Sequence, residues 1–189
     1  MQREPTFRRC ANPYAGAVPD PSKAVLITGC SSGIGRASAK TLASSGWTVY
    51  ATARRLESIA DLAATGCRTP ALDVTDEQSM QAAVAEIERA EGAVGVLINN
   101  AGYSQSGAIE SVPMEAVRRQ FETNVFGLVR LTQLVLPKMR AQRWGKIVNV
   151  GSMGGRCRSP AAGIATRPST RSRPSPTRCA SSCAALAST

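Results

Sequence analysis

Residues 23–36 read KAVLITGCSSGIGR and set the architecture of this chain. The run KAVLIT is short, apolar and rich in β-branched residues, which is typical of a strand buried on both faces. Gly29, Gly33 and Gly35 follow it, and a helical pattern begins among them. This order suits a nucleotide pyrophosphate, because glycines let the backbone approach the phosphates and the first N–H groups of the helix face the negative charge. Glycine-rich turns also occur in ordinary loops, so the turn alone leaves both interpretations open.

Composition narrows the class of protein. The chain has 189 residues, 43% of them hydrophobic and 19% charged, which predicts one globular domain with a core. No apolar run approaches the roughly 20 residues of a membrane span, so no membrane partner is expected. Six cysteines form no C-x-x-C pair and there is no histidine. We therefore expect free thiols, a cytoplasmic location, no metal site and no histidine-dependent triad.

The two ends differ in composition from the middle. Residues 1–22 contain no apolar core of a secretory signal, and their Pro, Gly, Asn and Arg content predicts a flexible leader. Residues 156–189 contain six of the 23 basic residues and no acidic one. Their Pro, Ser and Arg content predicts an irregular or disordered tail. Such a tail could also act as a nucleic-acid arm. The folded domain is expected at residues 23–155.

Between these ends, apolar runs alternate with helical patterns. Strands are expected at the first run and at 47–53, 68–74, 94–99 and 146–150. Helices are expected at 34–45, 56–65, from a Thr75 cap to 91, and at 111–142 with a break near Pro137. The last helix has a wide apolar face formed by Phe121, Val125, Leu128, Val129, Leu131 and Leu134. The alternation predicts an α/β fold, a doubly wound parallel sheet of about five strands in the order 3-2-1-4-5, with the last strand as an open edge.

Unusual residues at the expected strand ends form a recurring set of motifs: TGCSSGIG at 28–35, DV at 73–74, NNAG at 99–102, the Asn of FETNVFG at 121–127, and IVNVGS at 147–152. In type, order and spacing this set resembles the short-chain dehydrogenase/reductase family over residues 23 to about 156. The resemblance implies a Rossmann-like fold and a nicotinamide dinucleotide bound beyond the strand ends. It implies that the pyrophosphate and its ribose are lined by Gly29, Ser31, Ser32, Gly33, Ile34 and Gly35. It places Asp73 and Val74 at the adenine, and Asn99, Ala101 and Gly102 along the adenine ribose.

The choice of cofactor follows from the end of the second strand. An acidic residue there accepts hydrogen bonds from the ribose hydroxyls of NAD, whereas arginine accommodates the 2′-phosphate of NADP. In ATARR, Ala53 occupies the acidic position and Arg54 and Arg55 follow. NADP is therefore expected over NAD, although an exposed arginine is often only a solvated charge.

The catalytic set implied by the resemblance is incomplete. Ser152 and Asn124 match the serine that polarises the substrate carbonyl and the asparagine that helps to hold a proton-relay water. A Tyr-x-x-x-Lys pair should follow Ser152, but the last tyrosine is Tyr103 and the last lysine is Lys146. The resemblance implies hydride transfer between the nicotinamide and a small alcohol or carbonyl substrate, and we expect this chain to be impaired or inactive. The alternative is a catalytically silent dinucleotide-binding or regulatory protein.

A shift of the reading frame after Gly155 would explain the missing pair. When the last base of each codon is read with the first two of the next, Arg171 onward is compatible with AVEALTDALRFELRGFGVD, which is amphipathic and resembles the family's helix after the catalytic lysine. In that frame Pro168-Ser169 can encode lysine, while no tyrosine codon is placed. The basic tail would then be codons read out of phase rather than a nucleic-acid arm. The resemblance also implies two further strands, for which no residues are left here, so the chain is expected to be truncated. For full-length relatives it implies homo-oligomers.

Overall fold

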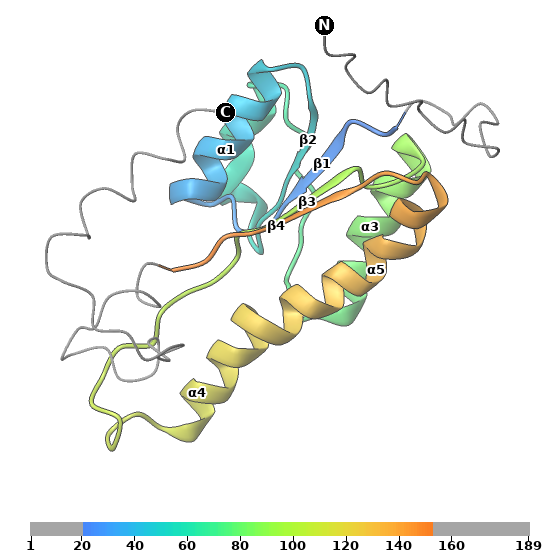
Figure 1. Cartoon of the computed structure of the whole chain (residues 1–189). Coiled ribbons are helices and arrows are strands. Elements are labelled where there is room, and N and C mark those ends of the chain that lie inside the picture. The colour runs from blue at the N-terminus through green and yellow to red at the C-terminus, as the bar shows by residue number, and fades with distance from the viewer. Residues whose placement is uncertain (1–20, 153–189) are drawn as a thin grey trace, which may run out of the picture.

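The computed structural model describes residues 21–152 (Figure 1). Four parallel strands form one sheet in the order β2-β1-β3-β4. Their bounds are β1 (Ala24–Ile27), β2 (Thr48–Ala51), β3 (Val96–Asn99) and β4 (Lys146–Asn149). In the register of the sheet, Leu26 of β1 lies opposite Tyr50 of β2 on one side and Leu97 of β3 on the other. The strand order changes direction between β1 and β3, so the switch point of the sheet lies beside the glycine turn, as expected for a Rossmann-like sheet.

The expected third strand does not form a regular strand. Residues 68–74 make only two isolated parallel bridges, Tyr50 with Arg68 and Ala53 with Ala71. Pro70 lies between the two bridging residues and has no N–H to donate, so a continuous ladder cannot form there. The segment still lies on the outer side of β2, so the predicted order 3-2-1-4-5 is retained with this segment in the third strand's place.

Helices cover both faces of the sheet, with α1 on one face and α3 and α5 on the other (Figure 1). Their bounds are α1 (Gly33–Ser44), η1 (Leu56–Ile59), α2 (Ala60–Ala63), α3 (Glu77–Glu91), α4 (Met114–Phe121), η2 (Glu122–Phe126) and α5 (Gly127–Ala141). The predicted Thr75 cap of α3 is wrong, because Asp76 is the cap and accepts a hydrogen bond from the Gln78 amide. Thr75 instead donates its hydroxyl to Asp73.

The long helix differs from the expectation in two respects. It contains a π-turn, η2, between α4 and α5, and this turn divides the predicted apolar face. Leu131 is fully buried, whereas Phe121 and Val129 remain 45% exposed. Pro137 does not break the helix, because α5 continues to Ala141. The carbonyl that Pro137 leaves without a helical donor belongs to Gln133, which is exposed and can be hydrated.

Two apolar clusters hold the layers together. One packs β1 residues such as Leu26 against α3 and α5, through side chains including Ile87 and Val135. The other packs Val25 and Ile27 against α1 and the 56–63 segment. In the part of the chain that the structure describes, β4 is an edge strand of the sheet, and all four of its residues are exposed. Within residues 21–152, no helix is long and apolar enough to cross a membrane.

Candidate functional site

The glycine turn after β1 is built so that no side chain could fit at two of its positions. Gly29 has a φ of +71°, and a Cβ there would lie 2.8 Å from the Cα of Ala101. A Cβ on Gly35 would lie 2.7 Å from the carbonyl oxygen of Gly29. Gly33 has a φ of +60°, but nothing lies within 4 Å of its Cβ position. The turn is therefore closed toward the sheet and open above Gly33.

The N-terminus of α1 lies in this open space without a protein cap. Its N-cap residue, Ser32, has an extended backbone and makes no side-chain capping bond, and the first turn holds no acidic residue. Ser31, Ser32, Gly33 and Ile34 are all exposed, Ile34 to 63%. Uncapped N–H groups and the positive end of the helix dipole favour an anion at this position.

Two polar residues that the sequence analysis did not place in the site hold the turn against β3. The hydroxyl oxygen of Thr28 accepts hydrogen bonds from the amides of Asn100 (3.0 Å) and Ala101 (2.9 Å). The side-chain amide of Asn100 donates to the carbonyls of Thr28 (2.9 Å) and Gly29 (3.0 Å). Asn100 thus replaces hydrogen bonds that the tight turn cannot make to itself. The signal for it was present in NNAG, where only the first asparagine was assigned to the site.

The other predicted cofactor residues lie along the same strand ends. The Nδ2 of Asn99 donates to the side-chain oxygen of Asn149 (2.9 Å) and to the hydroxyl of Thr132 (3.3 Å). It therefore joins β3 to β4 and α5, while its role beside the ribose stays a prediction. Ala101 is half-buried and Gly102 is exposed beyond β3.

Asp73 and Val74 follow the bridged segment beside β2. The Oδ1 of Asp73 accepts hydrogen bonds from the amide and the hydroxyl of Thr75, at 2.9 and 2.8 Å. Val74 is 8% exposed and lies against the start of α5, where a Cβ on Gly127 would come within 3.0 Å of the Val74 Cβ. Gly127 allows α5 to approach this strand end. Its role could not be predicted from the sequence, because a glycine inside a helical pattern carries no distinct signal.

The two predicted catalytic residues lie at the same end of the sheet. Asn124 lies in the π-turn η2, where its amide donates to the carbonyl of Tyr103 (2.8 Å) and accepts from the Tyr103 N–H (3.1 Å). π-turns are frequent at functional sites, because the extra residue reorients a side chain. Ser152 is exposed three residues beyond β4 and is the last described residue. The predictions on residues 1–20 and 153–189, including the shifted reading frame, lie outside the described residues.

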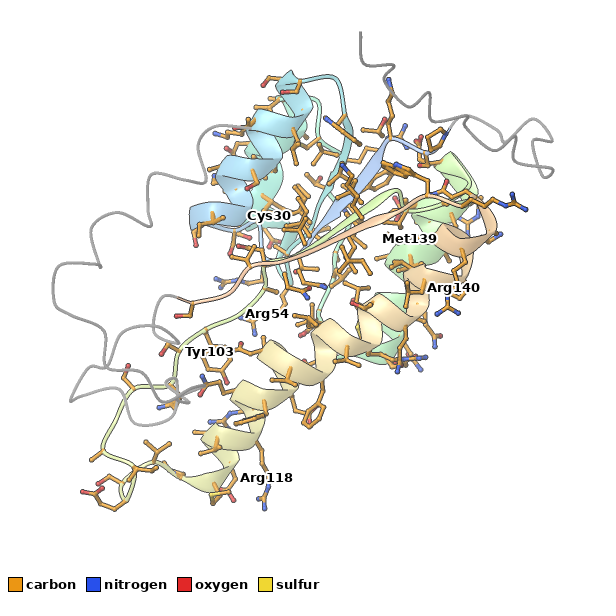
Figure 2. All side chains as sticks on the ribbon, in the orientation of Figure 1. Cys30, Arg54, Tyr103, Arg118, Met139 and Arg140 are labelled. Carbon is orange, nitrogen blue, oxygen red and sulfur yellow. The ribbon has the colours of Figure 1, made fainter. Side chains whose placement is uncertain are left out.

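Arginines lie at the end of β2. Ala53 is 5% exposed and turns inward, whereas Arg54 and Arg55 are exposed. Among residues 21–152, neither of these two arginines takes part in an ion pair. Figure 2 shows Arg54 and Tyr103 at the same end of the sheet as Cys30, which follows Gly29.

The guanidinium of Arg36, in the first turn of α1, is held by contacts within the chain. It donates to the carbonyls of Ser31 (3.2 Å) and Ser58 (2.9 Å) and pairs with Asp61. This role of Arg36 could not be predicted from the sequence, because a lone arginine in a helix looks like a solvated charge.

Other groups near the turn offer no separate chemistry. Burial raises the pKa of the Cys30 thiol to about 12, so this thiol stays protonated.

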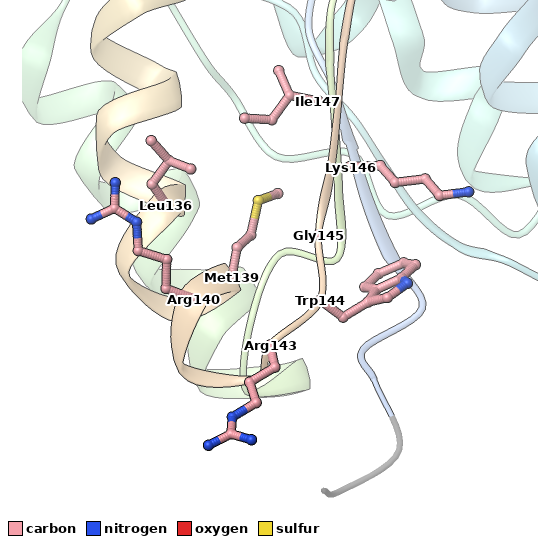
Figure 3. Close-up of a pocket in the computed structure, with 8 residues that line it drawn as sticks. All are labelled: Leu136, Met139, Arg140, Arg143, Trp144, Gly145, Lys146 and Ile147. Carbon is pink, nitrogen blue, oxygen red and sulfur yellow. The ribbon is translucent and has the colours of Figure 1, made fainter. Parts of the chain in front are cut away.

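Within the described part of the chain, no cluster of three or more His, Cys, Asp or Glu side chains could hold a metal ion. A shallow pocket of about 540 Å³ lies elsewhere, between the end of α5 and the start of β4, where Met139 and Trp144 line it (Figure 3).

Comparisons with known proteins agree with this geometry. The family model described as short chain dehydrogenase matches residues 23–164. A 3-ketodihydrosphingosine reductase from Bacteroides thetaiotaomicron is 43% identical over 132 residues, which cover 69% of this chain and 47% of that protein. An NADPH-dependent 3-dehydrocapnine reductase from Ornithobacterium rhinotracheale is 36% identical over 152 residues, covering 76% of this chain and 51% of that protein.

A solved structure shows the same arrangement. The crystal structure of a short-chain dehydrogenase from Streptomyces avermitilis superposes with a TM-score of 0.70 at 42% identity, and the match covers 75% of this chain and 53% of that one. The chain thus spans about half the length of the curated relatives it matches. With its four-stranded parallel sheet, glycine turn and matched residues 23–164, the chain belongs to the short-chain dehydrogenase family.

Proposed function

We propose that this chain binds NADP(H) at the glycine turn and derives from an enzyme that transfers hydride between the nicotinamide and an alcohol or carbonyl substrate. The observation that carries the proposal is the glycine turn itself. Its backbone is closed against Ala101 and Asn100 and open above Gly33, and an uncapped helix N-terminus faces the opening. These residues fit a pyrophosphate, because they combine close backbone approach with donor N–H groups.

The preference for NADP rests on charge at the end of β2. Ala53 leaves no carboxylate to accept hydrogen bonds from a ribose 2′-hydroxyl, and the guanidinium groups of Arg54 and Arg55 are exposed without ion pairs among the described residues. A 2′-phosphate supplies the charge and geometry that guanidinium binds best. The name of the Ornithobacterium relative, which specifies NADPH, supports the same choice.

The residues present account for part of the chemistry. The dinucleotide supplies or accepts the hydride when bound. Ser152 would donate a hydrogen bond to the substrate oxygen. Asn124 fixes the loop that contains Tyr103 to the long helix through its two hydrogen bonds to Tyr103. No tyrosine of this sequence has a lysine four residues later, so the usual proton donor is missing. We therefore propose that the chain binds NADP(H) in the cytoplasm and turns over slowly or not at all.

Titration of the full 189-residue chain with NADPH and with NADH tests cofactor binding. We expect NADPH to bind at least about ten-fold more tightly, and Arg54→Ala to remove most of that difference, since a charge-assisted hydrogen bond is worth about 1.5–3 kcal/mol. Arg118→Ala, on the exposed side of α4, is the matched control and should leave both affinities unchanged (Figure 2). Equal affinity for the two cofactors would contradict the NADP assignment, and lack of binding would contradict the function.

An activity assay distinguishes an enzyme from the catalytically silent alternative. A panel of aldehydes and ketones is offered with NADPH, and oxidation of the cofactor is followed. Binding without turnover favours the catalytically silent protein, whereas turnover favours an enzyme. Sequencing of the coding DNA across codons 150 to 189 tests the shifted frame, and an uninterrupted frame through that region rules it out.

A further inference from the structure

Arg36 connects three segments around the glycine turn. Its guanidinium donates to the carbonyl of Ser31, in the turn, at 3.2 Å and to the carbonyl of Ser58, in η1, at 2.9 Å. The same group pairs with the carboxylate of Asp61, in α2. One half-buried side chain thus ties the N-terminus of α1 to the η1–α2 segment that follows β2.

The contacts continue from Ser58 to the arginine pair. The N–H of Ser58 donates to the carbonyl of Arg55 at 3.2 Å, and its hydroxyl donates to the same carbonyl at 2.6 Å. The backbone of Arg55 is therefore held by Ser58, and Ser58 is held by Arg36. Arg54 and Arg55 are the exposed cations at the end of β2, and within residues 21–152 neither side chain forms an ion pair.

We propose that Arg36 and Asp61 form a brace that positions Arg54 and Arg55 for the 2′-phosphate of NADP, so that Arg36 is a positioning residue for cofactor selectivity. The proposal rests on the proposed function. A dinucleotide spans from the α1 N-terminus to the end of β2, and the brace joins these two places through protein contacts. Fixing that spacing before binding lowers the cost of ordering the loop when the 2′-phosphate arrives.

The charges in the brace indicate that Arg36 positions other residues rather than contacting the phosphate itself. Hydrogen bonding from Arg36 lowers the pKa of the Asp61 carboxyl, which therefore stays ionised at neutral pH. The guanidinium is then already matched to a carboxylate and two carbonyls. Lys40, whose ammonium lies 3.8 Å from the other Asp61 oxygen, carries charge to the same place but does not hydrogen-bond to Ser31 or Ser58.

The test uses 2′,5′-ADP and 5′-ADP, which differ only in the 2′-phosphate, and measures their affinities for the full chain by calorimetry. We expect Arg36→Met and Asp61→Ala each to weaken 2′,5′-ADP binding by about ten-fold while changing 5′-ADP binding by less than about two-fold, as for the loss of one or two net hydrogen bonds. Lys40→Met is the matched control and should leave both affinities unchanged. Arg36→Lys should also lose selectivity, because an ammonium lacks the planar fork that reaches three acceptors.

Asp61→Ala separates the brace from simple electrostatics. Removing a negative charge near a phosphate strengthens binding if the brace is irrelevant, and it also frees Arg36 to reach the phosphate. The brace requires weaker binding, so tighter or unchanged 2′,5′-ADP binding by Asp61→Ala overturns the proposal. An equal loss for both ligands in Arg36→Met also overturns it, because it indicates general damage. Failure of the proposed function is seen separately, since the unmodified chain would then bind neither ligand or show no preference between them.

Discussion

Replacing Thr28 by valine should destabilise the domain far more than the size of the change suggests. Valine has nearly the same shape, so no cavity forms in this 1%-exposed position. The hydroxyl oxygen that accepts from the amides of Asn100 and Ala101 is lost, however, and both N–H groups are left without that partner. An unsatisfied buried donor costs about 1–3 kcal/mol, and these two are only half-buried, so we expect a loss of about 2–4 kcal/mol.

Thr52→Val is a matched control for this prediction. Thr52 is also fully buried, and its hydroxyl donates to the carbonyl of Ile27 at 2.9 Å. That carbonyl still accepts the N–H of Thr52 at 3.0 Å after the change, so we expect a loss of about 1 kcal/mol or less. Both free energies of unfolding are measured by urea titration with far-UV circular dichroism. If the two variants lose equal stability, the role assigned to Thr28 is refuted.

Three further changes test other parts of the structure. Gly35→Ala should abolish NADPH binding and lower the urea midpoint, since its Cβ would meet the Gly29 carbonyl at 2.7 Å; retained binding in a titration would contradict the closed turn. The Arg130 guanidinium holds the pKa of Glu77 below its usual range. The stability from that pair is therefore present above the unfolded pKa of Glu77 and lost as pH falls through the lowered folded value. Glu77→Gln should accordingly destabilise the chain at pH 7 but not at strongly acidic pH, as read from thermal melts at both. Finally, Cys30, whose pKa burial raises to about 12, should react with iodoacetamide at about pH 8 only after urea unfolding, and rapid alkylation of the native chain, followed by mass spectrometry, would show that the thiol is accessible.

The first strand and the glycine turn could be predicted because their signals are local. A β-branched run leading into Gly29 has few alternatives, and β1 forms where expected. The sheet order followed from the alternation of strands and helices. The third strand failed because Pro70 withholds one donor, an effect that outweighs the β propensity of its neighbours.

Other features depend on contacts that no local pattern contains. Thr75 looked like a helix cap, but Asp73 takes its hydroxyl, so the cap moves to Asp76. The role of Arg36 depends on Ser58 and Asp61, which are 22 and 25 residues away and share no periodicity with it. The assignments of the cofactor and catalytic residues remain predictions, supported by where these residues lie.

The π-turn at Glu122–Phe126 makes the long helix sensitive to the number of residues within that turn. An extra residue there shifts everything before it by about 100° around the helix axis relative to everything after it. Removal of one residue would restore an even helix but turn Ala116 and Gln120, now buried, away from their present surroundings while Leu131 stayed in the core. A single-residue deletion between residues 122 and 126 would therefore change which side of α4 meets water, whereas a substitution at the same positions would not.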